Sequence, residues 1–197
     1  MDCIPRRTLV ATNVIVVRDI SKAEYIEHLT ALDKDSLHFR FGRVMTAESI
    51  STYVDAIPID DHILGAFNTV YDELACAAHV SITDDQAEVG ISTALLYRRQ
   101  GVGESLMVHI MAMCSNRDIH QLYMMCLTDN RAIISLCKKV GLAVVSSQGE
   151  SQTTLELPKA SLHTLGKELN MANMVIADIL LKPFKSNWQS WLKNHRH

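Results

Sequence analysis

The chain has 197 residues, of which 48% are hydrophobic and 21% charged, and both values are ordinary for a globular protein. This length suffices for one domain with an appendage, and for a core that needs no disulfide or metal. Nineteen Lys and Arg residues against 22 Asp and Glu give a net charge of −3. That balance excludes a strongly basic nucleic-acid binder, and no apolar run approaches the roughly 18 residues of a membrane span.

The cysteines argue for a reducing compartment. They are odd in number, widely spaced and free of any Cys-x-x-Cys pair, so neither a disulfide framework nor a structural zinc site is expected. The histidines form no His-x-x-x-His pair, so we expect no metal at all. We therefore expect a cytoplasmic protein. The five cysteines are Cys3, Cys76, Cys114, Cys126 and Cys137.

In chain order, the first half of the sequence predicts a strand, two helices and three strands. The β-branched stretch 10–17 predicts the first strand, and Ser21 with Glu24 forms a capping box that starts a helix. Residues 37–44 follow no regular period and are expected to be irregular, and Thr46 can cap a second helix. The three strands are expected at residues 62–70, 74–82 and 87–93.

The second half predicts helices that alternate with strands. A helix over 101–117 is apolar nearly all round, which indicates burial. A strand at 121–127 is followed by a helix over 130–140 with apolar residues at i, i+3, i+4 and i+7, and Gly141 is placed to end it. A last hairpin is expected from the segments 142–146 and 153–157.

This order of elements predicts an α/β fold, with a mixed and mostly antiparallel sheet of about seven strands flanked by helices. We expect one domain over residues 1–157 and a C-terminal helical extension over residues 158–197. The apolar positions of the extension suit packing on the domain, and a homodimer contact is the second interpretation.

The most informative stretch is RRQGVG at residues 98–103, between a predicted strand and a predicted helix. The first N–H groups of a helix have no internal partners and carry the positive end of its dipole. Glycines there let an anion approach the backbone, and the arginines add charge, so the stretch predicts a phosphate or pyrophosphate site. It matches neither a P-loop nor a dinucleotide fingerprint. The alternative is that the glycines only permit a tight turn.

Two segments, in this order, resemble the GNAT superfamily of N-acetyltransferases. The pattern Arg98-x-x-Gly101-x-Gly103 resembles that family's [Gln/Arg]-x-x-Gly-x-[Gly/Ala] signature, and DNRAIISLCKKVGL at 129–142 resembles its Asn-x-x-Ala-x-x-Leu-Tyr-x-x-x-Gly-Phe segment. The stretch LHFRFG, followed by a helix ending in YVDAI, is similar to a bacterial subgroup that includes the acyltransferase part of some protein-lysine acetyltransferases. The resemblance covers about residues 10–157.

The resemblance implies acetyl-CoA as the cofactor, with its pyrophosphate on the glycine turn. The acetyl-pantetheine arm would lie between the strands at 87–93 and 121–127, with its carbonyl oxygen held by backbone N–H groups of the first of these. Asn130 would contact the arm, and the Ser105 hydroxyl a phosphate. The implied cofactor-binding residues are Ile91, Ser92, Thr93, Arg98, Arg99, Gln100, Gly101, Val102, Gly103, Glu104, Ser105 and Asn130.

Two residues are candidates for proton transfer. Glu88 begins the strand before the glycine turn, near where related histone acetyltransferases carry a general base, and the alternative is a solvated strand-end charge. Cys137 stands where the family often has a Tyr that protonates the leaving thiolate. A thiol is an unusual donor, and the alternative for Cys137 is packing in the core.

Acceptor recognition is expected from the first helices, their connecting loop and one strand. The candidates are Phe39, Arg40, Phe41, Tyr53 and His79. Packing against the sheet is the alternative for the aromatic residues, and a satisfied core histidine is the alternative for His79, which is also a second candidate base.

These features predict an acetyl-CoA-dependent N-acetyltransferase that transfers an acetyl group directly to a primary amine of a protein or small molecule. Neither a nucleic acid nor a membrane is expected as a partner. A non-catalytic acyl-CoA-binding sensor is the alternative that the missing Tyr favours. A third interpretation is an interaction domain that has lost CoA binding.

Overall fold

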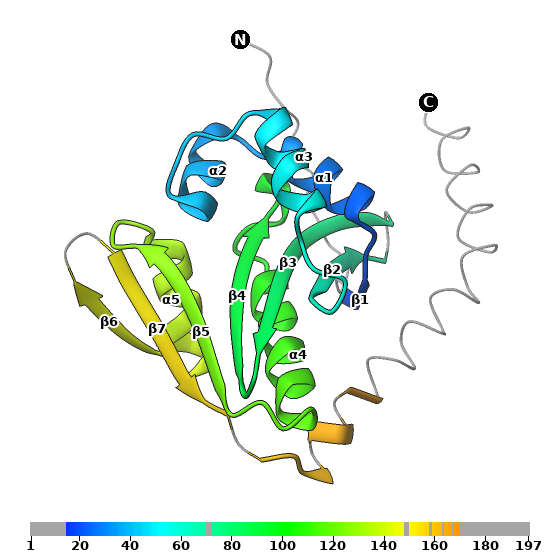
Figure 1. The fold of residues 1–197 in the computed structure, drawn as a ribbon, viewed down its shortest axis with the longest axis vertical. Helices are drawn as coiled ribbons and strands as arrows, with labels where there is room; N and C mark the ends of the chain where they lie inside the picture. Colours follow the sequence, from blue (N-terminus) through cyan, green and yellow to red (C-terminus); the bar gives the residue numbers. More distant parts are fainter. Residues whose placement is uncertain are drawn as a thin grey trace, which may run out of the picture.

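The computed structural model describes residues 15–69, 72–147, 150–157, 159–162, 164–166 and 168–169. Within these residues, seven strands form one sheet in the order β1-β2-β3-β4-β5-β7-β6 (Figure 1). Neighbouring strands are antiparallel except for β4 and β5, which run parallel. The strands are β1 (Ile15–Asp19), β2 (His62–Asn68), β3 (Glu73–Thr83), β4 (Gln86–Thr93), β5 (Gln121–Leu127), β6 (Ala143–Ser147) and β7 (Glu150–Glu156).

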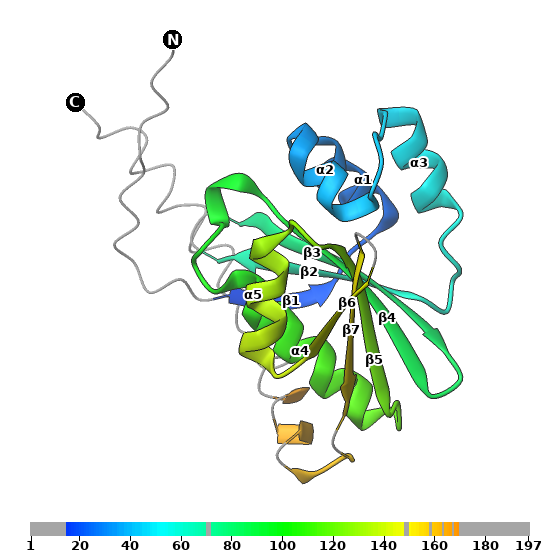
Figure 2. The same cartoon turned by 90° about the vertical axis from the view of Figure 1, so that its left-hand side faces the viewer.

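Helices cover the sheet on both faces (Figure 2). One face carries the first three helices, whose buried residues Tyr25, Leu29 and Val54 form one apolar cluster with Ala77 of β3. The other face carries the last two, and there Leu106 and its neighbours form the larger cluster. The helices are α1 (Lys22–Thr30), α2 (Lys34–Phe41), α3 (Ala47–Asp55), α4 (Val102–Asn116) and α5 (Arg131–Val140), with a 3-10 turn at Leu95–Tyr97.

The predicted helix ends are confirmed by their caps. The Ser21 hydroxyl accepts from the backbone N–H of Glu24, and the Glu24 carboxylate accepts from the backbone N–H of Ser21, which is the complete capping box. Thr46 caps α3 through Ser49 N–H, and Gly141 ends α5 with a φ of +88°. Because these signals are local, the sequence alone was enough to find them.

The helix α2 corrects the sequence-based prediction, which left residues 37–44 irregular. Asp33 caps this helix by accepting from Ser36 N–H at 2.9 Å, and Gly42 ends it in the left-handed conformation with a φ of +68°. Only Ser36 and Leu37 are buried in α2, so its eight residues carry no apolar stripe. Such a helix is stabilised by its caps and by tertiary contacts. Its sequence therefore lacks the regular spacing of apolar residues from which a helix is predicted.

The strands β4 and β5 separate after a short segment in which they pair. They pair only from Gln86 opposite Gln121 to Glu88 opposite Tyr123, although β5 continues to pair with β7 as far as Leu127. Beyond that point the two parallel strands diverge (Figure 1). We call this parting of β4 beyond Glu88 from β5 beyond Tyr123 the wedge.

The predicted helical extension over residues 158–197 falls mostly outside the described residues, as does the start of the predicted first strand. The described part of the chain contains no helix that is both long and apolar enough to cross a membrane.

Candidate active site

The backbone of β4 offers hydrogen-bonding groups to the wedge at alternate residues. Ala94 N–H donates to Ala75 O at 2.9 Å, and these two residues continue the antiparallel register of β3 and β4. Because the direction of backbone groups alternates along a strand, Ser92 and Gly90 bond toward β3, whereas Ile91 and Thr93 direct N–H and C=O away from it. Ile91 lies three residues beyond the last pairing with β5, so its groups face the wedge.

The N-terminus of α4 lies directly after this strand and has the form of an anion site. Gly101 is the N-cap with a φ of +78° and supplies no capping side chain. The first hydrogen bond of the helix runs from Ser105 N–H to Gly101 O at 2.9 Å, so the N–H groups of Val102, Gly103 and Glu104 precede the helical ladder. A Cβ at Gly101 would meet nothing within 4 Å, which leaves the approach to these donors open.

Two charged side chains of the glycine turn are engaged with other elements. Arg98 donates through Nη2 to Asp33 Oδ2 at 3.0 Å and to the Ser36 hydroxyl, and through Nε to Thr93 O at 3.3 Å. Arg98 therefore ties the N-terminus of α2 to the end of β4. Glu104 forms an ion pair with Lys139 of α5 at 3.4 Å.

Other predicted cofactor residues shape the turn itself. Gln100 donates to Leu96 O at 2.7 Å, and Val102 is buried in the core with its side chain turned away from the turn. Arg99 is exposed, has a φ of +59° and forms no ion pair within the described residues. Of the two arginines, Arg99 is the one whose charge is left for an anion.

One face of α5, from its first turn to its last, borders an open hollow of about 450 Å³ that the sequence did not predict. Asn130 caps α5 by accepting from Ile133 N–H at 3.2 Å, so part of this side chain serves the helix. Three cationic side chains border the hollow, which gives it a positive character suited to phosphate groups. Its lining residues are Arg131, Ile134, Ser135, Lys138 and Lys139.

The placement of Cys137 argues against its interpretation as a leaving-group acid. Cys137 has no exposed surface, belongs to the larger core cluster and donates through Sγ to Met124 Sδ at 3.7 Å. A thiol sealed in the core cannot pass a proton to a group in the wedge. The packing interpretation of Cys137 is the one that this placement favours.

Glu88 lies at the closed end of the wedge. It is the last β4 residue that pairs with β5, and its side chain is exposed. Along β4, Glu88, Gly90 and Ser92 share one face of the sheet, which is the face that α1–α3 cover. In the register of β3 and β4, Glu88 lies opposite Ser81 and His79 lies opposite Gly90, so Glu88 and His79 are on the same face, and the negative charge of Glu88 acts to raise the pKa of His79.

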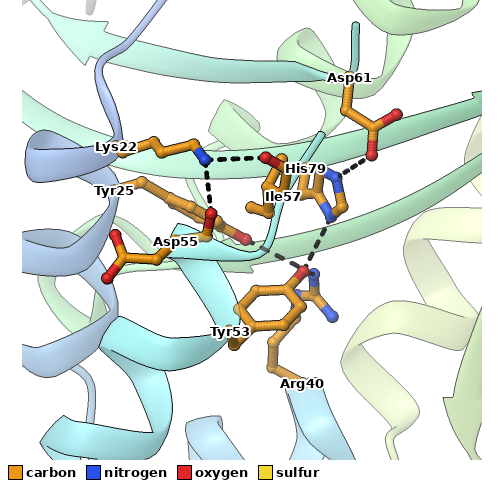
Figure 3. Close-up of polar contacts among 8 residues, drawn as sticks. All are labelled: Lys22, Tyr25, Arg40, Tyr53, Asp55, Ile57, Asp61 and His79. Atoms are coloured by element: carbon orange, nitrogen blue, oxygen red, sulfur yellow. Dashed lines mark hydrogen bonds and ion pairs between the residues drawn. The ribbon is translucent and has the colours of Figure 1, made fainter. Parts of the chain in front are cut away.

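Four predicted or neighbouring side chains form one hydrogen-bonded chain on this face (Figure 3). Arg40 of α2 donates through Nη2 to Tyr53 Oη of α3 at 3.1 Å. Tyr53 Oη contacts His79 Nδ1 of β3 at 2.8 Å, and His79 Nε2 contacts Asp61 Oδ2 at 2.8 Å. The Asp61 side chain is only 6% exposed, so its carboxylate is held against the histidine.

The donor in each of these hydrogen bonds follows from the residues at the two ends of the network, Asp61 and Arg40. The Asp61 carboxylate only accepts, so His79 Nε2 carries the proton and Nδ1 is the acceptor for the Tyr53 hydroxyl. The Tyr53 oxygen then accepts from Arg40. Burial lowers the pKa of His79 against the opposing effect of Asp61, and burial raises the pKa of Tyr53 to about 12. Both ring nitrogens of His79 are thus occupied, so the histidine orients Tyr53 and leaves no free lone pair to act as a base.

The guanidinium of Arg40 lies against the backbone of β4. A Cβ built on Gly90 would be 2.0 Å from Arg40 Nη2, so only glycine is compatible with this packing. The Phe41 and Tyr53 rings pack edge to face, 5.1 Å apart, with the guanidinium 4.8 Å from the Phe41 ring centre. Phe39 is not part of this group and lies beside His38 instead.

One buried pair on the same face was missed by the sequence analysis. His28 of α1 contacts the Ser92 hydroxyl through Nε2 at 3.0 Å, and both residues are buried. Burial lowers the pKa of His28 to about 4, so the ring is neutral near pH 7. Ser92 is therefore bound to α1 and β3 and directs neither its side chain nor its backbone into the wedge. A histidine on the buried stripe of α1, with Tyr25 and Leu29, was the available sequence signal.

The described residues contain no group of three or more His, Cys, Asp or Glu that could hold a metal ion. The arrangement therefore consists of a helix N-terminus suited to an anion, a set of unpaired strand amides and an exposed carboxylate on the face of the sheet that also carries Arg40.

Comparison with solved structures shows that this fold is shared by acetyltransferases. The GNAT domain of S. lividans PAT superposes with a TM-score of 0.61 at 18% identity, covering 72% of this chain and 89% of that one. A putative acetyltransferase from Salmonella typhimurium, solved with its cofactor acetyl-CoA, has a TM-score of 0.58 at 15% identity over 76% of this chain and 97% of that one.

A ribosomal-protein-alanine N-acetyltransferase from Brucella melitensis has a TM-score of 0.59 at 16% identity, covering 72% of this chain and 99% of that one. No protein-family model matches the chain, and no curated protein matches it. The likeness is therefore one of fold, and its description as the GNAT fold agrees with the resemblance found in the sequence.

Proposed function

We propose, from the GNAT fold of this chain, that it is an acetyl-CoA-dependent N-acetyltransferase that transfers an acetyl group directly to a primary amine. The observation that carries the proposal is the junction of the wedge with the N-terminus of α4. Unpaired strand amides and unpaired helix amides meet there within fourteen residues of chain, from Ile91 to Glu104 by way of the turn at Gly101.

The residues at this junction fit the donor molecule in kind. The N–H groups of Val102, Gly103 and Glu104 suit the pyrophosphate, because a helix N-terminus favours an anion, and Arg99 adds a positive charge. The cationic hollow beside α5 suits the remaining phosphate of the nucleotide end. Acetyl-CoA supplies an acetyl thioester there, and its amide-rich arm is a match for the unpaired backbone of the wedge.

Two groups of the chain carry the chemistry in this proposal. Ile91 N–H faces the wedge and would hold the carbonyl oxygen as negative charge develops on it. Glu88 is exposed at the closed end of the wedge and would take the proton that the amine must lose, directly or through one water. His79 is the weaker candidate base, because both of its ring nitrogens already have partners.

A second function, a non-catalytic acyl-CoA sensor, is favoured by one observation. Cys137, at the position where a leaving-group acid was expected, is sealed in the core. A thiolate is a good leaving group without protonation, so this observation weakens the enzyme proposal without removing it. Turnover separates the two functions, because a sensor binds the donor and leaves amines unchanged.

The test is calorimetric titration with acetyl-CoA, followed by a screen of amines for turnover. Wild type is expected to bind, and Gly103→Glu is expected to weaken binding at least about a hundredfold, because a carboxylate would occupy the anion site. Gly166→Glu is the control for an added carboxylate, since a Cβ on Gly166 would meet nothing within 4 Å and the residue lies far along the chain. Absence of binding to folded wild type would contradict both functions, and binding without turnover would favour the sensor.

A further inference from the structure

The guanidinium of Arg40 occupies an unusual place on the sheet. It lies where the side chain of residue 90 would stand, since a Cβ on Gly90 would come within 2.0 Å of Nη2 and 2.5 Å of Nη1. Gly90 is two residues beyond Glu88, so the positive charge is set beside the first unpaired stretch of β4. The helix α2 that carries Arg40 contacts both β4 and β5 and so reaches across the wedge.

Arg40 is half-buried, and its charge has little local compensation. Nη2 donates to two phenol oxygens, Tyr53 at 3.1 Å and Tyr25 at 3.5 Å, but Arg40 forms no ion pair with any Asp or Glu that the structure describes. Its Nε is sealed from solvent and has no hydrogen-bond partner. Nη1 is not sealed and forms no hydrogen bond within the described residues, so it is the donor left for a ligand. Burying a guanidinium without an anion is costly, and such exceptions call for a functional explanation.

The rest of the network holds the guanidinium in place. Asp61 fixes the tautomer of His79, His79 fixes the Tyr53 hydroxyl, and the Tyr53 oxygen then accepts from Arg40. The Asp61 carboxylate thus reaches Arg40 only through two intermediate groups, Tyr53 and His79. This hydrogen-bonded network orients Arg40 and keeps the Asp61 carboxylate away from it. The positive charge of Arg40 is therefore available to a ligand.

We infer that Arg40 binds a carboxylate of the acceptor, so that the acceptor is a small amino acid with a free acid group beside its amine. This inference rests on the proposed function and names its substrate class. The planar guanidinium matches a carboxylate in shape and charge. Glu88 and Gly90 lie roughly 7 Å apart along the strand. That distance suits an acceptor whose amine and carboxylate are separated by one or two carbon atoms, with Glu88 at the amine and Arg40 at the acid.

The experiment compares matched acids and amides as acceptors. The kcat/KM of amino acids, with β-alanine among them, is measured against that of their carboxamides, expressed per concentration of free amine because the two series differ in basicity. Wild type is expected to prefer the acids about tenfold to a hundredfold. Arg40→Gln should reduce that ratio to near one. Arg43→Gln is the matched control, because Arg43 is exposed on the same segment and should leave the ratio unchanged.

Two further measurements keep the inference open to contradiction. Arg40→Lys retains the charge and loses the planar fork, so it tests the same ratio if Arg40→Gln does not fold. Binding of N-acetylated amino acids against their amides, titrated in the presence of CoA, reads the same preference without turnover. Aminomethylphosphonate against glycine distinguishes a carboxylate site from a phosphate site.

The outcomes separate this inference from the proposed function. If acetyl-CoA binds but amides equal acids in both assays, or if phosphonates are preferred, the carboxylate assignment is wrong and the proposed function stands. If an equal loss for acids and amides follows Arg40→Gln, Arg40 has a structural role only. If acetyl-CoA does not bind, the proposed function fails, and the titrations with N-acetylated acids still decide whether Arg40 holds a carboxylate.

Discussion

The two ends of the candidate site use different kinds of chemical group. The cofactor end consists of backbone groups, namely the first N–H groups of α4 and the unpaired amides of β4. The acceptor end consists of side chains, with Arg40, Tyr53, His79 and Asp61 supplied by two helices, a strand and a loop. A backbone site tolerates sequence change wherever the chain path is kept, whereas a side-chain site changes with each residue.

The largest expected effect comes from Glu88, at the boundary between the two ends. Glu88→Gln removes the proposed base and should lower kcat by about 10²–10⁴-fold, while the affinity for acetyl-CoA stays within a factor of about two. Glu27→Gln, at an exposed position on α1, is the control. Full activity of Glu88→Gln across the pH range would show that the base lies elsewhere and would move attention to Tyr53 and His79.

The second effect is the pH dependence of stability that His28 contributes on the acceptor face. The folded-state pKa of His28 is about 4, below the ordinary 6.5, so the unfolded chain binds more protons between these values. The contribution of His28 to the free energy of unfolding should therefore be fully present above pH 6.5. It should decrease as the pH drops toward 4, with a total loss of about 3 kcal/mol.

Denaturant unfolding of wild type and His28→Gln at several pH values measures that loss. The variant should lack this part of the pH dependence, whereas His38→Gln, at an exposed histidine, should keep it. Equal pH dependence in wild type and His28→Gln would contradict the assignment of the proton to His28.

The smallest effect tests whether the cofactor end needs a side-chain acid. Cys137→Ala should lower the free energy of unfolding by about 1 kcal/mol, because it removes a buried group, and should leave kcat unchanged. Cys126→Ala, on the adjacent strand, is the control for loss of a buried thiol. A large fall in kcat for Cys137→Ala alone would restore the acid role that the packing argues against.

The sequence predicted the two ends unequally, for a physical reason. The glycine turn at 98–103 was recognisable because a helix N-terminus is a local structure, and its position next to a strand is written in consecutive residues. The individual candidates Arg40, Tyr53 and His79 were also found. Their connection through Asp61 was not, since it depends on how α2, α3 and β3 pack together.

The missed features share this dependence on packing. The helix α2 has no apolar period because Arg98 and the Asp33 cap hold it, and Arg98 lies 65 residues further along the chain. The burial of His28 follows from the packing of α1 on the sheet, where its side chain reaches Ser92 of β4. The sequence placed Ile91, Ser92 and Thr93 together, but the strand register separates Ser92 from the other two.

The wedge also bears on the risk of aggregation. Unpaired strand edges recruit strands from other chains, and proteins usually cover or interrupt them. Here the unpaired edge of β4 lies inside a sheet rather than at its rim, with β5 beginning at its base. An intruding strand needs about 5 Å to each neighbour along its whole length, and diverging strands offer that spacing at only one level. The geometry thus keeps hydrogen-bonding groups free for a narrow, non-peptide chain while denying them to another β-strand.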